Sequence, residues 1–332
     1  MTPWISDSTV LIVGLGLMGG SYAKALKRLG YRVCALARRQ ETIDYAIEHD
    51  IIDAGSVDVN PELVGSADAV VFALYPEAFK QWIAEHQHLL KPGALLTDVT
   101  GVKCAIVYDI QGMLRPDVEF IAAHPMAGKE VYGVENSDER MFRDANYIVT
   151  PTVTNTPEAV EWCKSLGKIL GFRKVSVLSP EEHDEMIGFV SQLTHCIAVS
   201  LMTCLDNPNL VDYTGDSFRD LTRIARINDE MWSELFLLNK DDLLAQMDMF
   251  LTEFMELQNM LEHDDVEGMR SKMRLSTARR AYFDKPTGGA LACTVADPVT
   301  GLASDPEAGF VEDLEAGLVA GPQAGPTTEQ TR

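Results

Sequence analysis

Val10-Leu-Ile-Val-Gly-Leu-Gly-Leu-Met-Gly-Gly-Ser-Tyr-Ala-Lys-Ala-Leu26 is the stretch on which the architecture of this chain depends. Its first four residues, Val10 to Val13, are all apolar and mostly β-branched, which predicts a short strand buried on both faces. Gly14, Gly16 and Gly19 follow in G-x-G-x-x-G spacing, and the residues after them have the pattern of a helix. This order of strand, glycine loop and helix favours a dinucleotide site over a simple glycine-rich turn.

The glycines of this loop meet three physical needs of cofactor binding. They permit a tight turn, a close approach of the backbone to a pyrophosphate, and close contact between helix and strand. The N-terminus of the helix then presents free N–H groups and the positive end of its dipole to the phosphates. We therefore expect the cofactor to lie against Gly14, Leu15, Gly16, Leu17, Met18 and Gly19.

The end of the second expected strand, at 32–37, bears on which nicotinamide cofactor is bound. A site that prefers NAD usually has Asp or Glu there, which binds the ribose 2′-hydroxyl. This chain has Ala37 followed by Arg38 and Arg39, which favours the 2′-phosphate of NADP. NAD stays the alternative if the two arginines only coat a loop. Tyr75, at the end of a later strand, is expected on the nicotinamide side.

Composition limits the classes of protein to consider. With 332 residues, the chain has room for two domains. Its net charge of −22 argues against nucleic acid or an anionic membrane as a partner, so an anionic substrate would need a local island of Arg, Lys and His. The six cysteines show no C-x-x-C pairing, no signal peptide is visible, and we see no segment of membrane-spanning length. We expect a cytoplasmic protein with reduced thiols and no metal.

The pattern of elements divides the chain into three parts. Through residue 179, strands alternate with helices, which predicts an α/β domain with a doubly wound parallel sheet of the Rossmann type. Residues 180–284 are expected to form an all-α domain, whose apolar stretch 186–205 indicates a homodimer interface or core. Residues 285–332 are interpreted as a disordered acidic tail. The further strands are expected at 69–74, 94–98, 118–123, 147–151 and 174–178, and the first helices after the glycine loop at 41–49 and 78–90.

His124 is the first candidate for chemistry. It lies in Ala123-His-Pro-Met-Ala-Gly-Lys-Glu130, directly after an expected strand. The carboxyl ends of parallel strands form the edge at which open α/β sheets bind ligands. Because the unperturbed pKa of histidine suits proton abstraction near neutrality, we interpret His124 as a general base beside the nicotinamide. A purely structural histidine is the alternative.

Asp98-Val-Thr-Gly-Val-Lys103 follows a neighbouring strand and is the second candidate. Thr100 could supply a hydroxyl and Lys103 a cation at the same edge of the sheet. The alternative is a capped turn with a solvated lysine.

Three arginines form the third candidate. Arg219, Arg223 and Arg226 recur at spacings of four and three, so one helix would align them on one face. Guanidinium groups bind carboxylates bidentately, which suits a substrate that carries carboxylates. A solvated face paired with nearby aspartates is the alternative. His195, on an apolar helix, is a ligand candidate only if that helix lines the cleft.

Taken together, the motifs from Val10 to about Phe283 resemble those of the prephenate/arogenate dehydrogenase family of tyrosine biosynthesis. The segments that carry the resemblance are G-L-G-L-M-G-G-S (14–21), D-V-T-G-V-K (98–103), H-P-M-A-G-K-E (124–130), S-Q-L-T-H (191–195), F-R-D-L-T-R-I-A (218–225) and M-W (231–232).

The resemblance implies a prephenate dehydrogenase, which carries out the NAD(P)-dependent oxidative decarboxylation of prephenate to 4-hydroxyphenylpyruvate. His124 would take the proton of the ring hydroxyl, and Arg223 would bind a substrate carboxylate. Arg219 would assist, from the other subunit of a dimer. The remaining residues that the resemblance places around the substrate are His195, Trp232, Glu130 and Gln192.

The chain departs from the family pattern at specific positions. Gly101 stands where many members have a serine that donates a hydroxyl to the substrate, and we expect Thr100 to replace it. Gln192 stands where S-H-L-P-H versions have a histidine. We expect neither an N-terminal chorismate mutase segment nor a C-terminal ACT domain, so any feedback control would act at the active site.

Other functions remain open from the sequence. Arogenate (cyclohexadienyl) dehydrogenase is the main alternative, although His195 favours prephenate. A β-hydroxyacid dehydrogenase would carry a catalytic lysine on the helix at 186–205, which has none. A dinucleotide sensor without catalysis would need neither His124 nor Arg223.

Overall fold

The computed structural model describes Trp4 and residues 8–284. The chain divides into two compact units, Met1–Asn259 and Met260–Arg332, which are described separately. The tail expected at 285–332 lies outside the described residues.

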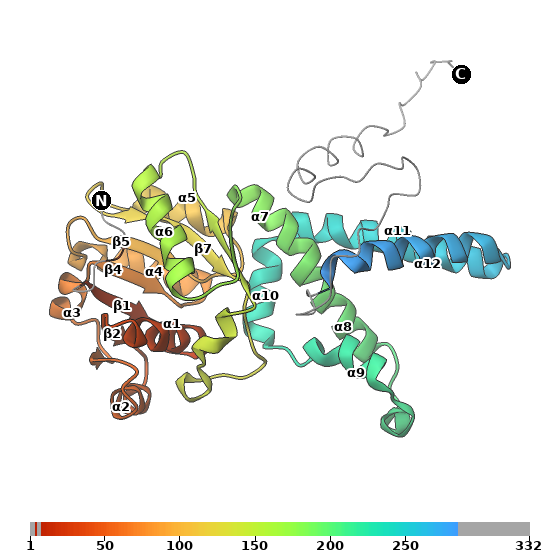
Figure 1. Ribbon diagram of the computed structural model, residues 1–332, viewed down its shortest axis with the longest axis horizontal. Coiled ribbons are helices and arrows are strands. Elements are labelled where there is room, and N and C mark those ends of the chain that lie inside the picture. The colour runs from red at the N-terminus through yellow and green to blue at the C-terminus, as the bar shows by residue number, and fades with distance from the viewer. Residues whose placement is uncertain (1–3, 5–7, 285–332) are drawn as a thin grey trace, which may run out of the picture. The chain divides into compact units, whose positions relative to one another are not determined.

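A six-stranded parallel sheet forms the centre of the first unit (Figure 1). Its strand order is β3-β2-β1-β4-β5-β6, which confirms the doubly wound topology. The strands are β1 (Thr9–Val13), β2 (Arg32–Leu36), β3 (Ala54–Ser56), β4 (Ala69–Phe72), β5 (Leu95–Asp98) and β6 (Glu119–Phe120). The crossover helices are α1 (Leu17–Arg28), α2 (Gln40–Glu48), α3 (Pro61–Ser66), α4 (Pro76–His86, continued by η1, Gln87–Leu89) and α5 (Cys104–Met113).

The alternation of side chains along β1 explains why both faces of the sheet are covered. Val10 and Ile12 belong to one buried cluster, and Leu11 and Val13 belong to the other. Each of these side chains contributes about 1.5–3 kcal/mol when fully buried. A strand that is apolar at every position therefore requires helices on both sides, as observed.

The strand expected at 118–123 is in fact two strands. The chain leaves the parallel sheet after β6, and β7 (Ala122–Pro125) joins a second sheet of order β7-β8-β9. There it pairs antiparallel with β8 (Asn146–Thr150), which pairs parallel with β9 (Lys174–Val177). His124 consequently lies within β7, opposite Ile148, and not beyond the end of a parallel strand. The segment after β7 contains η2 (Val134–Asn136) and η3 (Glu139–Phe142), and α6 (Pro157–Ile169) connects β8 to β9.

A continuous helix begins the helical region of the first unit. A capping box begins it, because the Ser179 hydroxyl accepts from the Glu182 N–H and the Glu182 carboxylate accepts from the Ser179 N–H. The helix comprises α7 (Pro180–Ile187), the π-helical turn η4 (Gly188–Leu193) and α8 (Thr194–Thr203). The elements that follow are η5 (Pro208–Tyr213), α9 (Asp216–Thr222), η6 (Arg223–Ala225), α10 (Asp229–Leu238) and α11 (Lys240–Glu262). The described part of the second unit contains α12 (Val266–Arg280) and η7 (Ala281–Phe283).

The helix from Pro180 to Thr203 differs from one expectation. It is 24 residues long with a mean hydropathy of 1.4, so by length and composition it could cross a membrane. The sequence pattern does not predict such a segment, because acidic residues in the first two turns of this helix interrupt the apolar run. The same helix buries the polar side chains of His183 and Asp184 and exposes Met186, Phe189 and Val190. This distribution suits a helix that packs on its own domain with one face and on another protein surface with the other.

Candidate active site

The glycine loop after β1 has the shape that a dinucleotide pyrophosphate requires. Gly14 has a φ of +97°, and a Cβ added there would lie 2.3 Å from the Ala73 carbonyl oxygen. A Cβ on Gly19 would lie 2.0 Å from the Gly14 carbonyl oxygen, whereas the space above Gly16 is open. No side chain caps the N-terminus of α1, and its first turn contains no acid. The backbone N–H groups of this turn are therefore free to bind phosphate.

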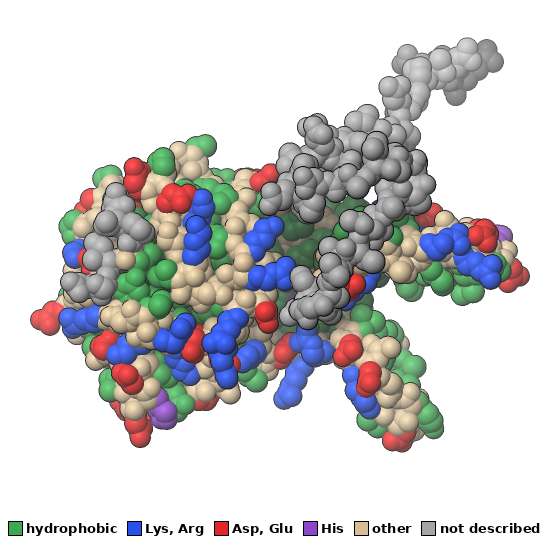
Figure 2. Space-filling model, in the orientation of Figure 1, with side chains coloured by type: hydrophobic (Ala, Val, Ile, Leu, Met, Phe, Trp, Pro, Cys, Tyr) green, Lys and Arg blue, Asp and Glu red, His purple; other side chains and the backbone are tan. Residues whose placement is uncertain are grey.

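The flanks of the loop carry the other expected cofactor residues. Leu15 is buried, and Leu17 and Met18 are partly buried. Arg38 and Arg39 are exposed beyond β2, and Arg39 is the N-cap of α2. Figure 2 shows Lys and Arg side chains gathered on the face that carries α1, a local basic island on a chain of net charge −22. The exposed Tyr75 precedes α4, and its hydroxyl accepts a hydrogen bond of 3.1 Å from Asn228.

His124 lies at the end of a chain of buried polar groups. Its Nδ1 lies 2.9 Å from Nε2 of His183, and Nδ1 of His183 lies 2.7 Å from the Asp184 carboxylate. Burial, followed by repulsion from His183 and Lys103, holds the pKa of His124 well below its usual value. Burial also lowers the pKa of His183. Both imidazoles are therefore neutral near pH 7, which is the state that a general base needs.

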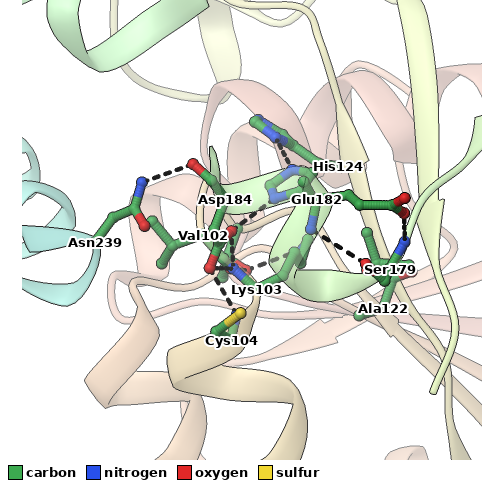
Figure 3. A network of polar contacts seen from close by, with 12 residues as sticks. Val102, Lys103, Cys104, Ala122, His124, Ser179, Glu182, Asp184 and Asn239 are labelled. Carbon is green, nitrogen blue, oxygen red and sulfur yellow. Dashed lines mark hydrogen bonds and ion pairs between the residues drawn. The ribbon is translucent and has the colours of Figure 1, made fainter. Parts of the chain in front are cut away.

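Lys103 does not face the ligand-binding edge of the sheet, where its sequence position predicted a cation. Its side chain is 0% exposed, and its ammonium donates to the Asp98 carboxylate (2.7 Å), the Thr100 hydroxyl (3.1 Å) and the Ala123 carbonyl (2.7 Å). Figure 3 shows Lys103 in the same polar network as His124. An ammonium with three protein partners in the interior supports the strand that carries His124 and does not face a substrate.

Thr100 also differs from the expectation of a catalytic hydroxyl. Its side chain is almost fully buried, and its Oγ1 contacts the Asp98 carboxylate and the Val102 carbonyl. Because the hydroxyl already has acceptors for its proton, it cannot replace the serine hydroxyl at the Gly101 position. A Cβ added to Gly101 would lie 3.9 Å from Cε1 of His124 and 3.5 Å from Leu235, both ordinary contact distances, so a side chain could be accommodated beside the imidazole.

Gln192, expected to bind substrate, is buried beneath the site. Its amide nitrogen donates to the Leu235 carbonyl (3.1 Å), and its amide oxygen accepts from Asn239 (2.8 Å). Gln192 therefore joins η4 to α10, the helix that carries Trp232. Its contacts fit a supporting role and leave no group facing a ligand.

The other substrate-site candidates lie together. The rings of His195 and Trp232 are in contact, with centroids 3.8 Å apart and planes tilted by 31°, and Nδ1 of His195 lies 2.8 Å from the Ser191 carbonyl. Arg223 forms an ion pair with Glu130, on the loop that follows β7. Both of these charges influence the pKa of His195, which burial lowers. Residues from the sheet region and the helical region thus meet at one site.

The prediction that one helix carries all three arginines is wrong. Helix α9 ends at Thr222, Arg223 lies in η6, and Arg226 is in extended backbone after it. Arg219 is exposed, and its guanidinium lies 3.5 Å from the Asp216 carboxylate. This ion pair is separate from the pair of Arg223 with Glu130. The structure brings Arg223 to the site by a break in the helix, which spacing alone does not reveal.

His183 and Asp184 are site residues that the sequence pattern does not predict. Two adjacent polar residues at the start of an apolar helix were the available signal, but the capping box beside them provided a sufficient local explanation. Within residues 8–284, no group of His, Cys, Asp and Glu has the arrangement of a metal site.

Comparisons with known proteins agree with this geometry. Residues 22–176 match the family described as "Prephenate dehydrogenase, nucleotide-binding domain", and residues 179–275 match "Prephenate dehydrogenase, dimerization domain". A prephenate dehydrogenase of Bacillus subtilis is 32% identical over 79% of this chain and 72% of the relative. A cyclohexadienyl dehydrogenase of Zymomonas mobilis is 27% identical over 77% of this chain and 89% of the relative.

A solved structure gives the same result. The crystal structure of prephenate dehydrogenase from A. aeolicus in complex with hydroxyphenyl propionate and NAD+ is 30% identical. The match covers 84% of this chain and 99% of that one, with a TM-score of 0.78. The two domain matches and these relatives show that the chain belongs to the prephenate dehydrogenase family.

Proposed function

We propose that this protein catalyses the oxidative decarboxylation of prephenate to 4-hydroxyphenylpyruvate, a step of L-tyrosine biosynthesis, as a cytoplasmic homodimer. The observation that carries the proposal is the position of His124. Its Cε1 would lie 3.9 Å from a Cβ added at Gly101, and the same Cβ would lie 3.5 Å from Leu235, on the helix of Trp232. A neutral imidazole thus lies at the junction of the sheet region and α10.

The chain's own residues supply positioning and proton transfer. A bound nicotinamide would supply the acceptor for the hydride that leaves the ring carbon bearing the substrate's hydroxyl. His124 accepts the hydroxyl proton as that hydride leaves. The bond to the ring carboxylate then breaks, CO₂ departs, and the electron pair aromatises the ring while His124 returns the proton to the oxygen. General-base catalysis of this kind contributes about 10²–10⁴-fold.

Arg223 is the residue that we propose to bind the substrate's side-chain carboxylate. In this structure its guanidinium pairs with Glu130 and remains largely exposed, so a substrate carboxylate could exchange with Glu130. The adjacent rings of His195 and Trp232 would form the adjoining wall. Arg219, which pairs with Asp216 and not with Glu130, is proposed to act on the site of the partner subunit in a homodimer, which the family's dimerisation domain supports.

The cofactor proposed is NADP in preference to NAD. The loop and the N-terminus of α1 fit the pyrophosphate of either molecule. The exposed Arg38 and Arg39 after Ala37 supply two guanidinium groups where an NAD site usually has a carboxylate. A relative from A. aeolicus was crystallised with NAD+, so the preference is tested by measurement on this chain.

The decisive experiment incubates the purified protein with prephenate or arogenate, each with NADP and with NAD, and follows the absorbance of the reduced nicotinamide. We expect the highest kcat/KM with prephenate and NADP. Faster oxidation of arogenate would establish the alternative substrate, and a clear preference for NAD would refute the role of the arginines. Oxidation of 3-hydroxy acids without activity on either cyclohexadiene would refute the proposal.

Arg38→Ala and Arg39→Ala sharpen the cofactor test. If these side chains bind the 2′-phosphate, their loss raises the KM for NADP and leaves the KM for NAD unchanged. Arg32→Ala, an exposed arginine at the start of β2 and away from the strand's carboxyl end, is the matched control. Equal changes in both KM values would show that the arginines do not discriminate.

A further inference from the structure

Nδ1 of His124 contacts a second imidazole, His183, which in turn contacts a buried carboxylate. We propose that His183 and Asp184 are positioning residues that fix the tautomer of His124, with its proton on Nδ1 and its lone pair on Nε2. The proposal deepens the proposed function, since it assumes that His124 is the base. It names two residues, on a different element from His124, on which that role depends.

The direction of the hydrogen bonds follows from the partners of Asp184. Its carboxylate accepts from the backbone N–H of Lys103 (2.8 Å) and from the backbone N–H of Cys104 (2.7 Å). A backbone N–H can only donate, so the buried carboxylate is held as an acceptor. Nδ1 of His183, 2.7 Å from the same carboxylate, must therefore carry a proton. Figure 3 shows Asp184, Lys103, Cys104 and His124 in one network of polar contacts.

The second step fixes His124. A neutral His183 with its proton on Nδ1 has a lone pair on Nε2. Nε2 lies 2.9 Å from Nδ1 of His124, so Nδ1 of His124 donates the proton of that bond. The lone pair of His124 is then on Nε2, on the far side of the ring. Burial lowers the pKa of both imidazoles, which keeps both neutral and preserves this order of donors and acceptors.

The relay is held rigidly. His183 and Asp184 are 0% and 1% exposed. Asn239 of α10 donates to the Asp184 carbonyl at 2.9 Å, and the His183 N–H donates to the Ser179 carbonyl at the start of α7. These contacts hold the backbone of α7 that carries both side chains, and the ring of His183 is held by its own contacts with His124 and Asp184. With Asp184 held as an acceptor, the two neutral imidazoles have one arrangement of protons, and the opposite tautomer of each is excluded.

Gly101 explains why this chain depends on His183. A side chain at this position would reach the edge of the His124 ring, since its Cβ would lie 3.9 Å from Cε1. Glycine supplies no hydroxyl there, and the Thr100 hydroxyl points to Asp98. Orientation of the imidazole must therefore come from its Nδ1 side, where His183 lies.

Three substitutions test the relay. Asp184→Asn allows the amide to donate to Nδ1 of His183, which would reverse both tautomers and move the His124 proton to Nε2. Where a carboxylate orients a catalytic imidazole, the same change lowers kcat by up to about 10⁴-fold; here we expect about 10²-fold or more with an unchanged dissociation constant for NADP. His183→Asn keeps an amide group near Nδ1 but removes the acceptor for His124, so kcat falls similarly. His183→Gln places an amide oxygen near the position of Nε2 and restores kcat to within about tenfold of the unmutated protein.

Glu182→Gln is the matched control, because it makes the same carboxylate-to-amide change one residue from His183. Glu182 is exposed and caps α7, a role that glutamine also fills. Its kcat and its thermal unfolding midpoint should match those of the unmutated protein.

Nitrogen-15 NMR of histidine-labelled protein reports the tautomer without any turnover. The unmutated protein should show His124 protonated on Nδ1, with assignment by comparison with His124→Asn. In Asp184→Asn the proton should move to Nε2. His124 protonated on Nε2 in the unmutated protein, or an unchanged kcat in His183→Asn, would overturn the proposal. If Asp184→Asn does not fold, the spectrum of the unmutated protein and the two His183 variants still decide. A correct tautomer in a protein inactive on prephenate would instead refute the proposed function.

Discussion

Replacing Lys103 with methionine should destabilise the protein more than any exposed charge substitution. Lys103 and Asp98 are both 0% exposed, and the ammonium has three partners at 2.7–3.1 Å. Methionine fills a similar volume but leaves the Asp98 carboxylate charged in the interior, with N–H donors of Thr100 and Ala123 as its remaining backbone partners. Breaking a buried ion pair in this way costs about 3–5 kcal/mol. With about 2–4 °C per kcal/mol for a domain of this kind, the unfolding midpoint should fall by about 6 °C or more.

Thermal and urea unfolding, monitored by circular dichroism, measure this loss. Lys80→Met is the control, since Lys80 pairs with exposed carboxylates of Glu77 and Asp109 and should cost at most about 1 kcal/mol. Adding Asp98→Asn to Lys103→Met removes the uncompensated charge, so the double variant should be more stable than the sum of the single losses implies. A loss of less than about 1 kcal/mol for Lys103→Met would refute the assignment of this buried pair.

Three further outcomes follow from the site. Because the pKa values of His124 and His183 lie below the usual 6.5, kcat should stay constant from alkaline pH down to pH 6.5 and fall only below it. The same histidines take up protons more readily in the unfolded protein, so the folded state also loses stability as the pH falls below 6.5. A fall in kcat that begins above pH 7 in the pH–rate profile would contradict this prediction. Arg223→Ala should raise the KM for prephenate about tenfold or more, as expected for the loss of a charged hydrogen bond. The free energy of unfolding should stay unchanged, because the pair of Arg223 with Glu130 is exposed. An unchanged KM in steady-state kinetics would show that Arg223 does not bind the substrate. Gly101→Ser should fold normally, because its Cβ meets Leu235 at an ordinary 3.5 Å, and its hydroxyl should raise kcat/KM about 2–10-fold. A lowered kcat/KM would show that the added hydroxyl obstructs the substrate.

Local signals in the sequence were sufficient for the parallel sheet. Val10 to Val13 and the glycine loop specify a buried strand and a tight turn by residue type alone, and Ser179 with Glu182 specifies a helix start. Each of these features depends on neighbours within a few residues, so a single sequence contains the necessary information.

Contacts between distant segments decided the features that the sequence did not reveal. The division of 118–123 into two strands accompanies a hydrogen bond from the Ala123 N–H to the Asp98 carboxylate, 25 residues away. The inward position of Lys103 follows from the same carboxylate, which needs a buried counter-ion. Asp184 binds the Lys103 N–H across 81 residues of sequence. Hydrophobic periodicity contains no information on such pairings.

The proposed catalysis depends on His124 as the base, and His124→Asn is the substitution that tests this role. Steady-state kinetics with prephenate and NADP should give a kcat lowered by about 10²-fold or more, while the dissociation constant for NADP, measured by fluorescence titration, stays unchanged. That combination identifies an interaction made in the transition state. A kcat within about twofold of the unmutated protein would contradict the assignment of His124 and the relay built on it.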